Sequence, residues 1–239
     1  MKKLIRKILR KKGFQITKYP DYDLERRIKL INHFDIDTLF DIGANIGQYA
    51  INMREIGFTK KIISFEPLKS AFSVLKDTSL NDNNWVVQNY ALGNENFKSV
   101  INVAGNSASS SILNMLPKHS NTEPESKYTT QEEIEIKTLD SVYNTLCKKE
   151  DRVMIKIDTQ GYEKNVIDGA TESLKNIKVI QIEMSIVPLY ENEMLFIEMI
   201  NHIDKKGFHL VSLENGFSDN TTGQLLQVDG IFVKKELLS

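Results

Sequence analysis

Carboxylates stand at the ends of several short apolar runs in this chain, where they could bind a ligand or act on one. They are Asp41, Glu66, Asp158 and Glu183. The runs have the length of buried strands, and helical patterns alternate with them. In open α/β sheets, ligands bind outside the carboxyl ends of the strands. We therefore expect these four side chains to lie near a ligand.

The loop after Asp41 is spaced by Gly43 and Gly47 and leads into a helical pattern. Because glycine has no Cβ, a ligand can approach the backbone there, and the first helical turn offers unpaired N–H groups. A dinucleotide fingerprint needs a second glycine where Asn45 stands. An acid beside the loop suits a cationic ligand better than a diphosphate. S-adenosylmethionine, with its ammonium and sulfonium, is such a ligand, and Glu66 is placed to accept hydrogen bonds from its ribose.

The stretch MIKIDTQGYEKNVIDGA, residues 154–170, places Lys156 and Asp158 on one face of a strand near its carboxyl end. Asp158 is therefore expected close to both cofactor and substrate. Lys156 is either a functional group of the site or only the ion-pair partner of Asp158. We interpret Glu163 as an acid in the first turn of the next helix, where its charge favours the helix dipole.

Composition and charge exclude several classes of protein. The 239 residues are 41% hydrophobic and 26% charged, which is typical of one soluble α/β domain with room for an insertion. The single cysteine, Cys147, allows no internal disulfide, and no Cys/His spacing predicts zinc. This cysteine usage indicates a reducing compartment, so a cytoplasmic protein is expected. No apolar run reaches the roughly 20 residues that span a bilayer. Residues 13–239 hold 24 basic and 32 acidic residues, so nucleic acid is not expected as a partner.

Strand and helix patterns alternate from residue 38 onward, which predicts a mainly parallel sheet flanked by helices, an α/β fold. Strands are expected at Thr38–Asp41, Lys61–Phe65, Trp85–Asn89, Lys98–Val103, Ile134–Lys137, Met154–Asp158, Val179–Met184, Phe208–Leu213 and Asp229–Lys234. Helices are expected at Tyr22–Phe34, Gly47–Ile56, Ser70–Leu80, Leu139–Cys147, Glu163–Leu174 and Glu193–Lys206.

Two segments fall outside this alternation. Residues 1–36 are predicted to form an N-terminal helical extension, and residues 37–239 a Rossmann-like domain. The extension begins with a basic amphipathic helix over residues 1–12, which either docks on the domain or makes a peripheral contact with an anionic membrane surface. A polar insertion at about 104–133 is too long for an ordinary connection, so it is either a functional lid or disordered.

A set of motifs follows in order between about residue 38 and residue 234. They are FDIGANIGQYA, SFEP, NYALG, TLDS, KIDTQGYE with DGA after it, QIEMS with PLY after it, and VDGIFVKK. Together they resemble FkbM-type methyltransferases, which are S-adenosylmethionine-dependent O-methyltransferases of the Rossmann-like class I. The resemblance implies methylation of a hydroxyl, most often on a sugar of a glycan, glycolipid or natural product. It also implies a set of cofactor contacts, with the methionine part lined by Asp41, Gly43, Asn45 and Gly47, the ribose bound by Glu66, and the methyl group beside Asp158.

Methyl transfer to a sugar hydroxyl is an in-line displacement in which alignment matters most and a nearby base helps. The histidines lie outside the motif turns, so the base is expected to be Asp158, with Glu183 and Lys156 as alternatives. Asp158 and Glu183 could instead share a divalent metal, although no metal is expected. Two other functions stay open, a nicotinamide-dependent oxidoreductase on the same fold and a non-catalytic cofactor-binding scaffold in glycan assembly.

Overall fold

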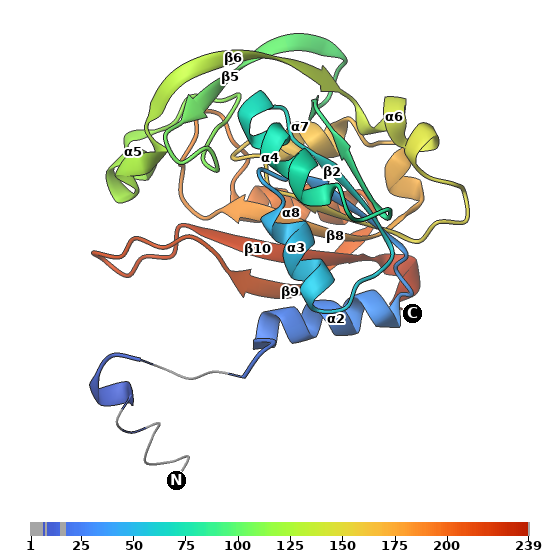
Figure 1. The fold of residues 1–239 in the computed structure, drawn as a ribbon, viewed down its shortest axis with the longest axis horizontal. Coiled ribbons are helices and arrows are strands. Elements are labelled where there is room, and N and C mark those ends of the chain that lie inside the picture. The colour runs from blue at the N-terminus through green and yellow to red at the C-terminus, as the bar shows by residue number, and fades with distance from the viewer. Residues whose placement is uncertain (1–6, 8, 15–17, 239) are drawn as a thin grey trace.

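A seven-stranded sheet forms the centre of the computed structural model, which describes residues 7, 9–14 and 18–238 (Figure 1). The strand order is β3-β2-β1-β7-β8-β10-β9. The strands are β1 (Thr38–Ile42), β2 (Lys61–Phe65), β3 (Trp85–Gln88), β7 (Val153–Ile157), β8 (Ile177–Ser185), β9 (Phe208–Asn215) and β10 (Gln227–Lys234). The first five in this order are parallel, whereas β10 is antiparallel to both β8 and β9. The predicted mainly parallel sheet is therefore confirmed.

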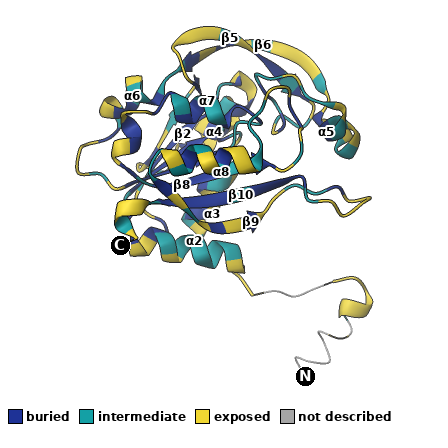
Figure 2. Ribbon diagram, turned by 180° about the vertical axis from the view of Figure 1, so that it is seen from behind, coloured by how far each residue is buried: buried dark blue, intermediate teal, exposed yellow. Residues whose placement is uncertain are grey.

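Helices cover both faces of this sheet (Figures 1 and 2). One face is packed by α2 (Tyr22–His33), α3 (Gln48–Glu55) and α4 (Lys69–Ser79). The other is packed by α6 (Leu139–Leu146), α7 (Glu163–Asp168) and α8 (Phe196–Lys205). Every residue of the central strands β1 and β7 is buried, as expected where helices lie on both sides.

A second, three-stranded sheet was not predicted. Its order is β4-β6-β5, with β4 (Ala91–Leu92), β5 (Phe97–Ala104) and β6 (Tyr128–Lys137). The long antiparallel pair β5 and β6 arches over the molecule at the top of Figure 1. Between them lie α5 (Pro117–Thr122) and the 3-10 turn η1 (Pro124–Ser126). The insertion at 104–133 is thus structured, and the alternative that it is disordered is wrong.

Two predicted elements have wrong bounds. The helix expected over Glu163–Leu174 ends at Asp168, and a separate 3-10 turn, η2, covers Ser173–Lys175. The strand expected at Ile134 already begins at Tyr128. The other predicted elements occur within a few residues of their expected bounds, and the chain closes with the 3-10 turn η3 (Lys235–Leu237).

The basic amphipathic helix predicted over residues 1–12 falls largely outside the described residues. Its apolar residues Leu4, Ile5 and Ile8 are among those not described, whereas Lys7 and residues 9–11 are helical. Neither docking nor membrane contact is therefore tested. In the part of the chain that the structure describes, no helix is long and apolar enough to cross a membrane.

Gly169, at the end of α7, packs closely against Gly93, which follows β4 of the small sheet. This contact allows a test of how the small sheet packs on the main domain. A Cβ added at Gly169 would lie 1.9 Å from the carbonyl oxygen of Gly93, whereas a Cβ added at Gly57 would have no neighbour within 4 Å. Gly57 has a positive φ, so alanine there costs only about 1–2 kcal/mol of backbone strain. We expect Gly169→Ala to lower the free energy of unfolding by about 3 kcal/mol, because backbone must shift. Urea denaturation of both variants checks this, and equal losses would contradict it.

Candidate active site

The loop between β1 and α3 approaches the end of β7 closely. Gly43 has φ +79°, and a Cβ there would lie 1.9 Å from the carbonyl oxygen of Asp158. Asn45 has φ +47°, a left-handed conformation that asparagine tolerates better than most residues. The N–H groups of Gly43 and Ala44 both donate to the carbonyl oxygen of Phe65, at 3.1 and 3.0 Å. The loop is therefore fixed to β2 and leaves bare backbone at the carboxyl end of the sheet.

Gly47 packs against the core, and the cofactor contact expected for it stays a prediction. A Cβ there would lie about 3.0 Å from side-chain atoms of Trp85 and Leu75, in the hydrophobic core under α3. Gly47 lines neither of the two cavities described below. The structure thus places it as a packing residue, because α3 must lie close to the sheet at this point.

Glu66 binds both loops that surround it. Its carboxylate accepts hydrogen bonds from the backbone N–H groups of Asn45 and Leu68, each at 2.8 Å. The side chain is buried at the end of β2, and burial raises its pKa to about 7. Each carboxylate oxygen has two lone pairs, so ribose hydroxyls can still donate to it.

Lys156 lies buried between two carboxylates. Its Nζ is 3.2 Å from Oδ2 of Asp158 and 3.6 Å from Oδ1 of Asp41, and its side chain is 9% exposed. Burial alone would lower the pKa of Lys156, but the two carboxylates outweigh it and raise the pKa. Asp41 is fully buried, Ser64 donates to its Oδ2 at 3.3 Å, and burial raises its pKa. Lys156 and Asp158 share a face, as predicted, and a lysine that stays protonated is a poor base.

Gln160 joins the two candidate catalytic carboxylates, a role that the sequence did not reveal. Its Nε2 donates to Oδ1 of Asp158 at 2.8 Å and to Oε2 of Glu183 at 2.9 Å. Its Oε1 accepts from the hydroxyl of Tyr190 at 2.7 Å. Gln227 also donates to Glu183, at 2.7 Å. Burial and the charge of Asp158 raise the pKa of Glu183 well above its usual range.

The hydrogen bonds of Gln160 matter for the hypothesis that Asp158 and Glu183 share a divalent metal. The amide nitrogen of Gln160 lies within hydrogen-bond distance of both Asp158 and Glu183. The described residues contain no group of three or more His, Cys, Asp or Glu side chains that could hold a metal ion. Shared coordination by these two carboxylates would require Gln160 to move first.

Glu163 does more than the first-turn acid that the sequence suggested. Its Oε1 accepts the backbone N–H groups of Thr159 at 2.7 Å and of Gly161 at 3.2 Å. The side chain is buried, and burial raises its pKa to about 7. Glu163 therefore fixes the loop that presents Asp158 and Gln160.

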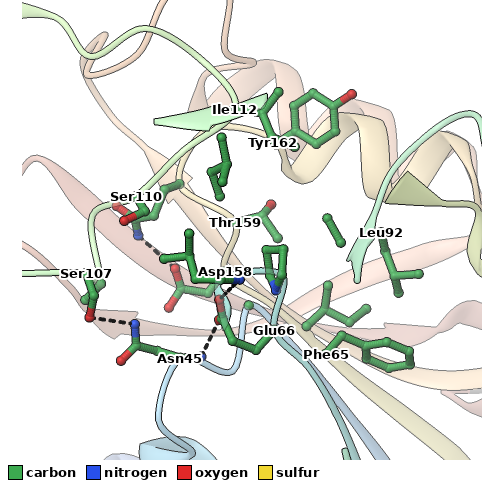
Figure 3. Close-up of a pocket in the computed structure, with 18 residues that line it drawn as sticks. Asn45, Phe65, Glu66, Leu92, Ser107, Ser110, Ile112, Asp158, Thr159 and Tyr162 are labelled. Carbon is green, nitrogen blue, oxygen red and sulfur yellow. Dashed lines mark hydrogen bonds between the residues drawn. The ribbon is translucent and has the colours of Figure 1, made fainter. Parts of the chain in front are cut away.

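A first cavity opens between the β1–α3 loop and the insertion (Figure 3). Glu66 and Asp158 lie at its polar side, and the apolar lining includes Phe65, Leu68, Leu92, Ile101, Ile112 and Tyr162. Residues 107–112 form its roof, and Ser107 accepts a hydrogen bond from Nδ2 of Asn45 at 3.0 Å. The free volume is about 60 Å³, below the roughly 150 Å³ that holds one benzene. Residues of the insertion cover this cavity, and the lid alternative for the insertion stays a prediction.

The architecture and the glycine loop between acidic strand ends define a Rossmann-like α/β fold with a ligand site at the carboxyl ends of its strands. Residues 41–210 match the family described as the methyltransferase FkbM domain, and this protein belongs to that family. The family predicted from the motifs is therefore confirmed. The cofactor predicted from the sequence, S-adenosylmethionine, agrees with membership of a methyltransferase family. No curated protein matches the chain.

Several solved structures are similar in fold. TehB from Haemophilus influenzae has 10% identity and a TM-score of 0.49, over 92% of this chain and 64% of that one. Precorrin-6y C5,15-methyltransferase from Geobacter metallireducens has 14% identity and a TM-score of 0.45, over 94% and 95%. TrmK from M. capricolum, in complex with S-adenosylhomocysteine, has 10% identity and a TM-score of 0.48, over 91% and 70%. The chain spans less than two thirds of the length of TehB.

The residues present fit this cofactor. Gly43 lets the backbone of the β1–α3 loop lie against the carboxyl end of β7, where any Cβ would lie 1.9 Å from the carbonyl oxygen of Asp158. Oδ1 of Asp41 is buried, and no described residue donates a hydrogen bond to it. The surplus of carboxylates over Lys156 suits a ligand that carries positive charge.

The cluster of acids makes stability depend on pH. Asp229 lies opposite Glu183 in the β8–β10 register, and burial, with the charge of Asp158, raises its pKa to about 6. An acid whose pKa is higher in the folded state destabilises the fold as pH rises from its unfolded pKa through its folded one. We expect Asp229→Asn to leave the free energy of unfolding unchanged near pH 4 and to raise it by about 1–2 kcal/mol at pH 8. Urea denaturation at both pH values checks this, with exposed Asp77→Asn as control. A gain at pH 8 that Asp77→Asn shares, or that persists at pH 4, would contradict the assignment.

Proposed function

We propose that this methyltransferase transfers the methyl group of S-adenosylmethionine to a hydroxyl on a sugar of a glycan, glycolipid or natural product. The carrying observation is the amide bridge of Gln160, which holds the carboxylates of Asp158 and Glu183 side by side at the carboxyl ends of β7 and β8. Carboxylates are strong acceptors for neutral hydroxyl donors. One of them beside the reacting atoms also supplies a base.

The cofactor is proposed to lie across the loop after β1. Its nucleoside occupies the first cavity, where Glu66 accepts the ribose hydroxyls. Its methionine part follows Gly43 and Asn45 toward Asp158. Asp41 lies beneath the loop and acts on the cofactor through Lys156. Support comes from the apolar lining beyond Glu66 and from the close approach of Gly43 to the end of β7.

When bound, the cofactor supplies a methyl group already activated by its sulfonium. The protein then aligns the acceptor oxygen with that carbon and takes up the hydroxyl proton. Asp158 is proposed as the base, because its carboxylate lies at the carboxyl end of β7, beside the ammonium of Lys156. Glu183 is the weaker candidate, since its raised pKa favours the protonated form at neutral pH. A protonated Glu183 would instead donate a hydrogen bond to the acceptor.

The charge of the protein bears on the class of acceptor. The acidic body of residues 13–239 disfavours nucleic acid and favours a small molecule or glycan. Membership of the methyltransferase family argues against nicotinamide chemistry. The intact set of Asp41, Glu66 and Asp158 argues against a scaffold without activity.

We place the enzyme in the cytoplasm, where S-adenosylmethionine is made, with contact at the inner membrane face through residues 1–12 as a further proposal.

Binding and transfer assays test this function. Titration calorimetry should show S-adenosylhomocysteine binding in the micromolar range and no binding of NAD. Incubation with S-adenosylmethionine labelled in its methyl group should then transfer label to sugar acceptors, in a linkage that resists the mild base that cleaves methyl esters. Label found only on amines or carboxylates would overturn the proposed acceptor class, and binding of NAD alone would overturn the cofactor.

One substitution at Asp158 tests whether this residue acts as the base or only binds the cofactor. We expect Asp158→Asn to lower kcat by about 10²–10⁴-fold, because a positioned base contributes that much. The affinity for S-adenosylhomocysteine should change by less than about tenfold. Steady-state kinetics with calorimetry on the same preparation measure both. If Asp158→Asn keeps its turnover while Glu183→Gln loses it, Glu183 is the base.

A further inference from the structure

A second cavity, of about 330 Å³, adjoins the first. The two share Gly43, Asn45, Ala108 and Asp158 in their linings. The second extends away from the nucleoside side, under α3, and reaches Arg27 of α2. A ligand that fills the first cavity and passes Gly43 therefore continues into the second.

Both signs of charge line this second cavity. The cations are Arg27 and Lys156, and the carboxylates are Asp158 and Asp229. Tyr49 lies between the cations, with its ring centroid 5.5 Å from Cζ of Arg27 and 5.4 Å from Nζ of Lys156. An α-amino acid in its zwitterionic form, with one ammonium and one carboxylate, matches such a lining. A nicotinamide ring or an uncharged sugar does not require a lining with both signs of charge.

Arg27 is held rigidly at the cavity. Its Nε and Nη2 donate to Oε2 of Glu214, on β9, at 2.9 and 2.6 Å. The side chains are only 15% and 2% exposed. This pair uses one edge of the guanidinium, and Nη1 lies outside it. A guanidinium group that is fixed in this way can bind a carboxylate with little loss of side-chain conformational entropy.

We propose that Arg27 binds the carboxylate of the methionine part of S-adenosylmethionine, and that the ammonium lies toward Asp229. The inference rests on the proposed placement of the nucleoside in the first cavity. It means that α2, which precedes the residues 41–210 matched by the family, completes the cofactor site.

The test compares two ligands that differ only in the amino acid end. S-adenosylhomocysteine has it, and 5′-methylthioadenosine lacks it. Arg27→Gln combined with Glu214→Gln replaces the ion pair by an amide pair, so no buried charge is left without a partner. Arg26→Gln is the matched control, because Arg26 contacts Ser212 and Leu213 of β9 from the same helix but does not line the cavity.

We expect the double variant to bind S-adenosylhomocysteine about 10–100-fold more weakly, the factor that a charged hydrogen bond confers. Its affinity for 5′-methylthioadenosine should stay within about twofold of the parent, as should both affinities of Arg26→Gln. Decarboxylated S-adenosylmethionine should bind the parent and the double variant equally, which assigns the effect to the carboxylate. If the double variant does not fold, Arg27→Lys replaces it, with an expected loss of about 3–10-fold for S-adenosylhomocysteine alone.

The outcomes distinguish this inference from the proposed function. Equal weakening of both ligands, or of neither, in the double variant overturns the role of Arg27. An unchanged affinity for S-adenosylhomocysteine with a raised KM for the acceptor overturns it as well and assigns the cavity to the acceptor. Failure of the parent protein to bind either ligand refutes the proposed cofactor placement itself.

Discussion

The buried ammonium of Lys156 is the interaction on which the rest of the site depends. It joins the carboxyl end of β1, through Asp41, to the end of β7, through Asp158. Removing one partner of a buried ion pair typically costs about 3–5 kcal/mol, because the remaining charge is left uncompensated. Because breaking the interaction is costly, it helps to hold the ends of β1 and β7 in place relative to each other. The loops that follow them, with Gly43 on one and Gln160 on the other, are therefore held at a constant separation, as an in-line displacement requires.

Buried carboxylates then fix the loops themselves. Glu66 accepts two backbone N–H groups around the β1–α3 loop, and Glu163 accepts two in the loop after β7. Loop N–H groups need partners when helices cover both faces of the sheet, and a carboxylate supplies two acceptors at once. The consequence is electrostatic. Burial, and then the charges of neighbouring acids, raise the pKa values of these carboxylates, and a positively charged ligand is favoured.

Much of this arrangement could be predicted from local patterns, and the failures have physical causes. Alternating apolar runs located the central strands, because each strand is buried on both faces. The start of β6 was missed because residues 129–133 are polar and exposed or half-exposed, so pairing with β5 and not burial stabilises them. The helix after Glu163 was predicted too long: it ends with Gly169 as its C-cap, where the backbone lies against Gly93 and has no room for a Cβ. The roles of Gln160 and Arg27 could not be predicted from a local pattern, since Glu183 and Glu214, with which they pair, lie far away in the sequence.

The proposed reaction also explains why a carboxylate stands where the positive charge of the sulfonium disappears. As the bond between oxygen and carbon forms, the bond between carbon and sulfur breaks, and its electron pair neutralises the sulfur. The proton released from the hydroxyl passes to Asp158. One positive charge is lost at sulfur and one is gained at the carboxylate, so the total charge of the buried site stays constant. A site already rich in acids tolerates this exchange well, because protonating Asp158 relieves the repulsion that raises the pKa values of Glu183 and Asp229. The amide of Gln160 can stay in place throughout, since it donates a hydrogen bond to each carboxylate through a separate hydrogen.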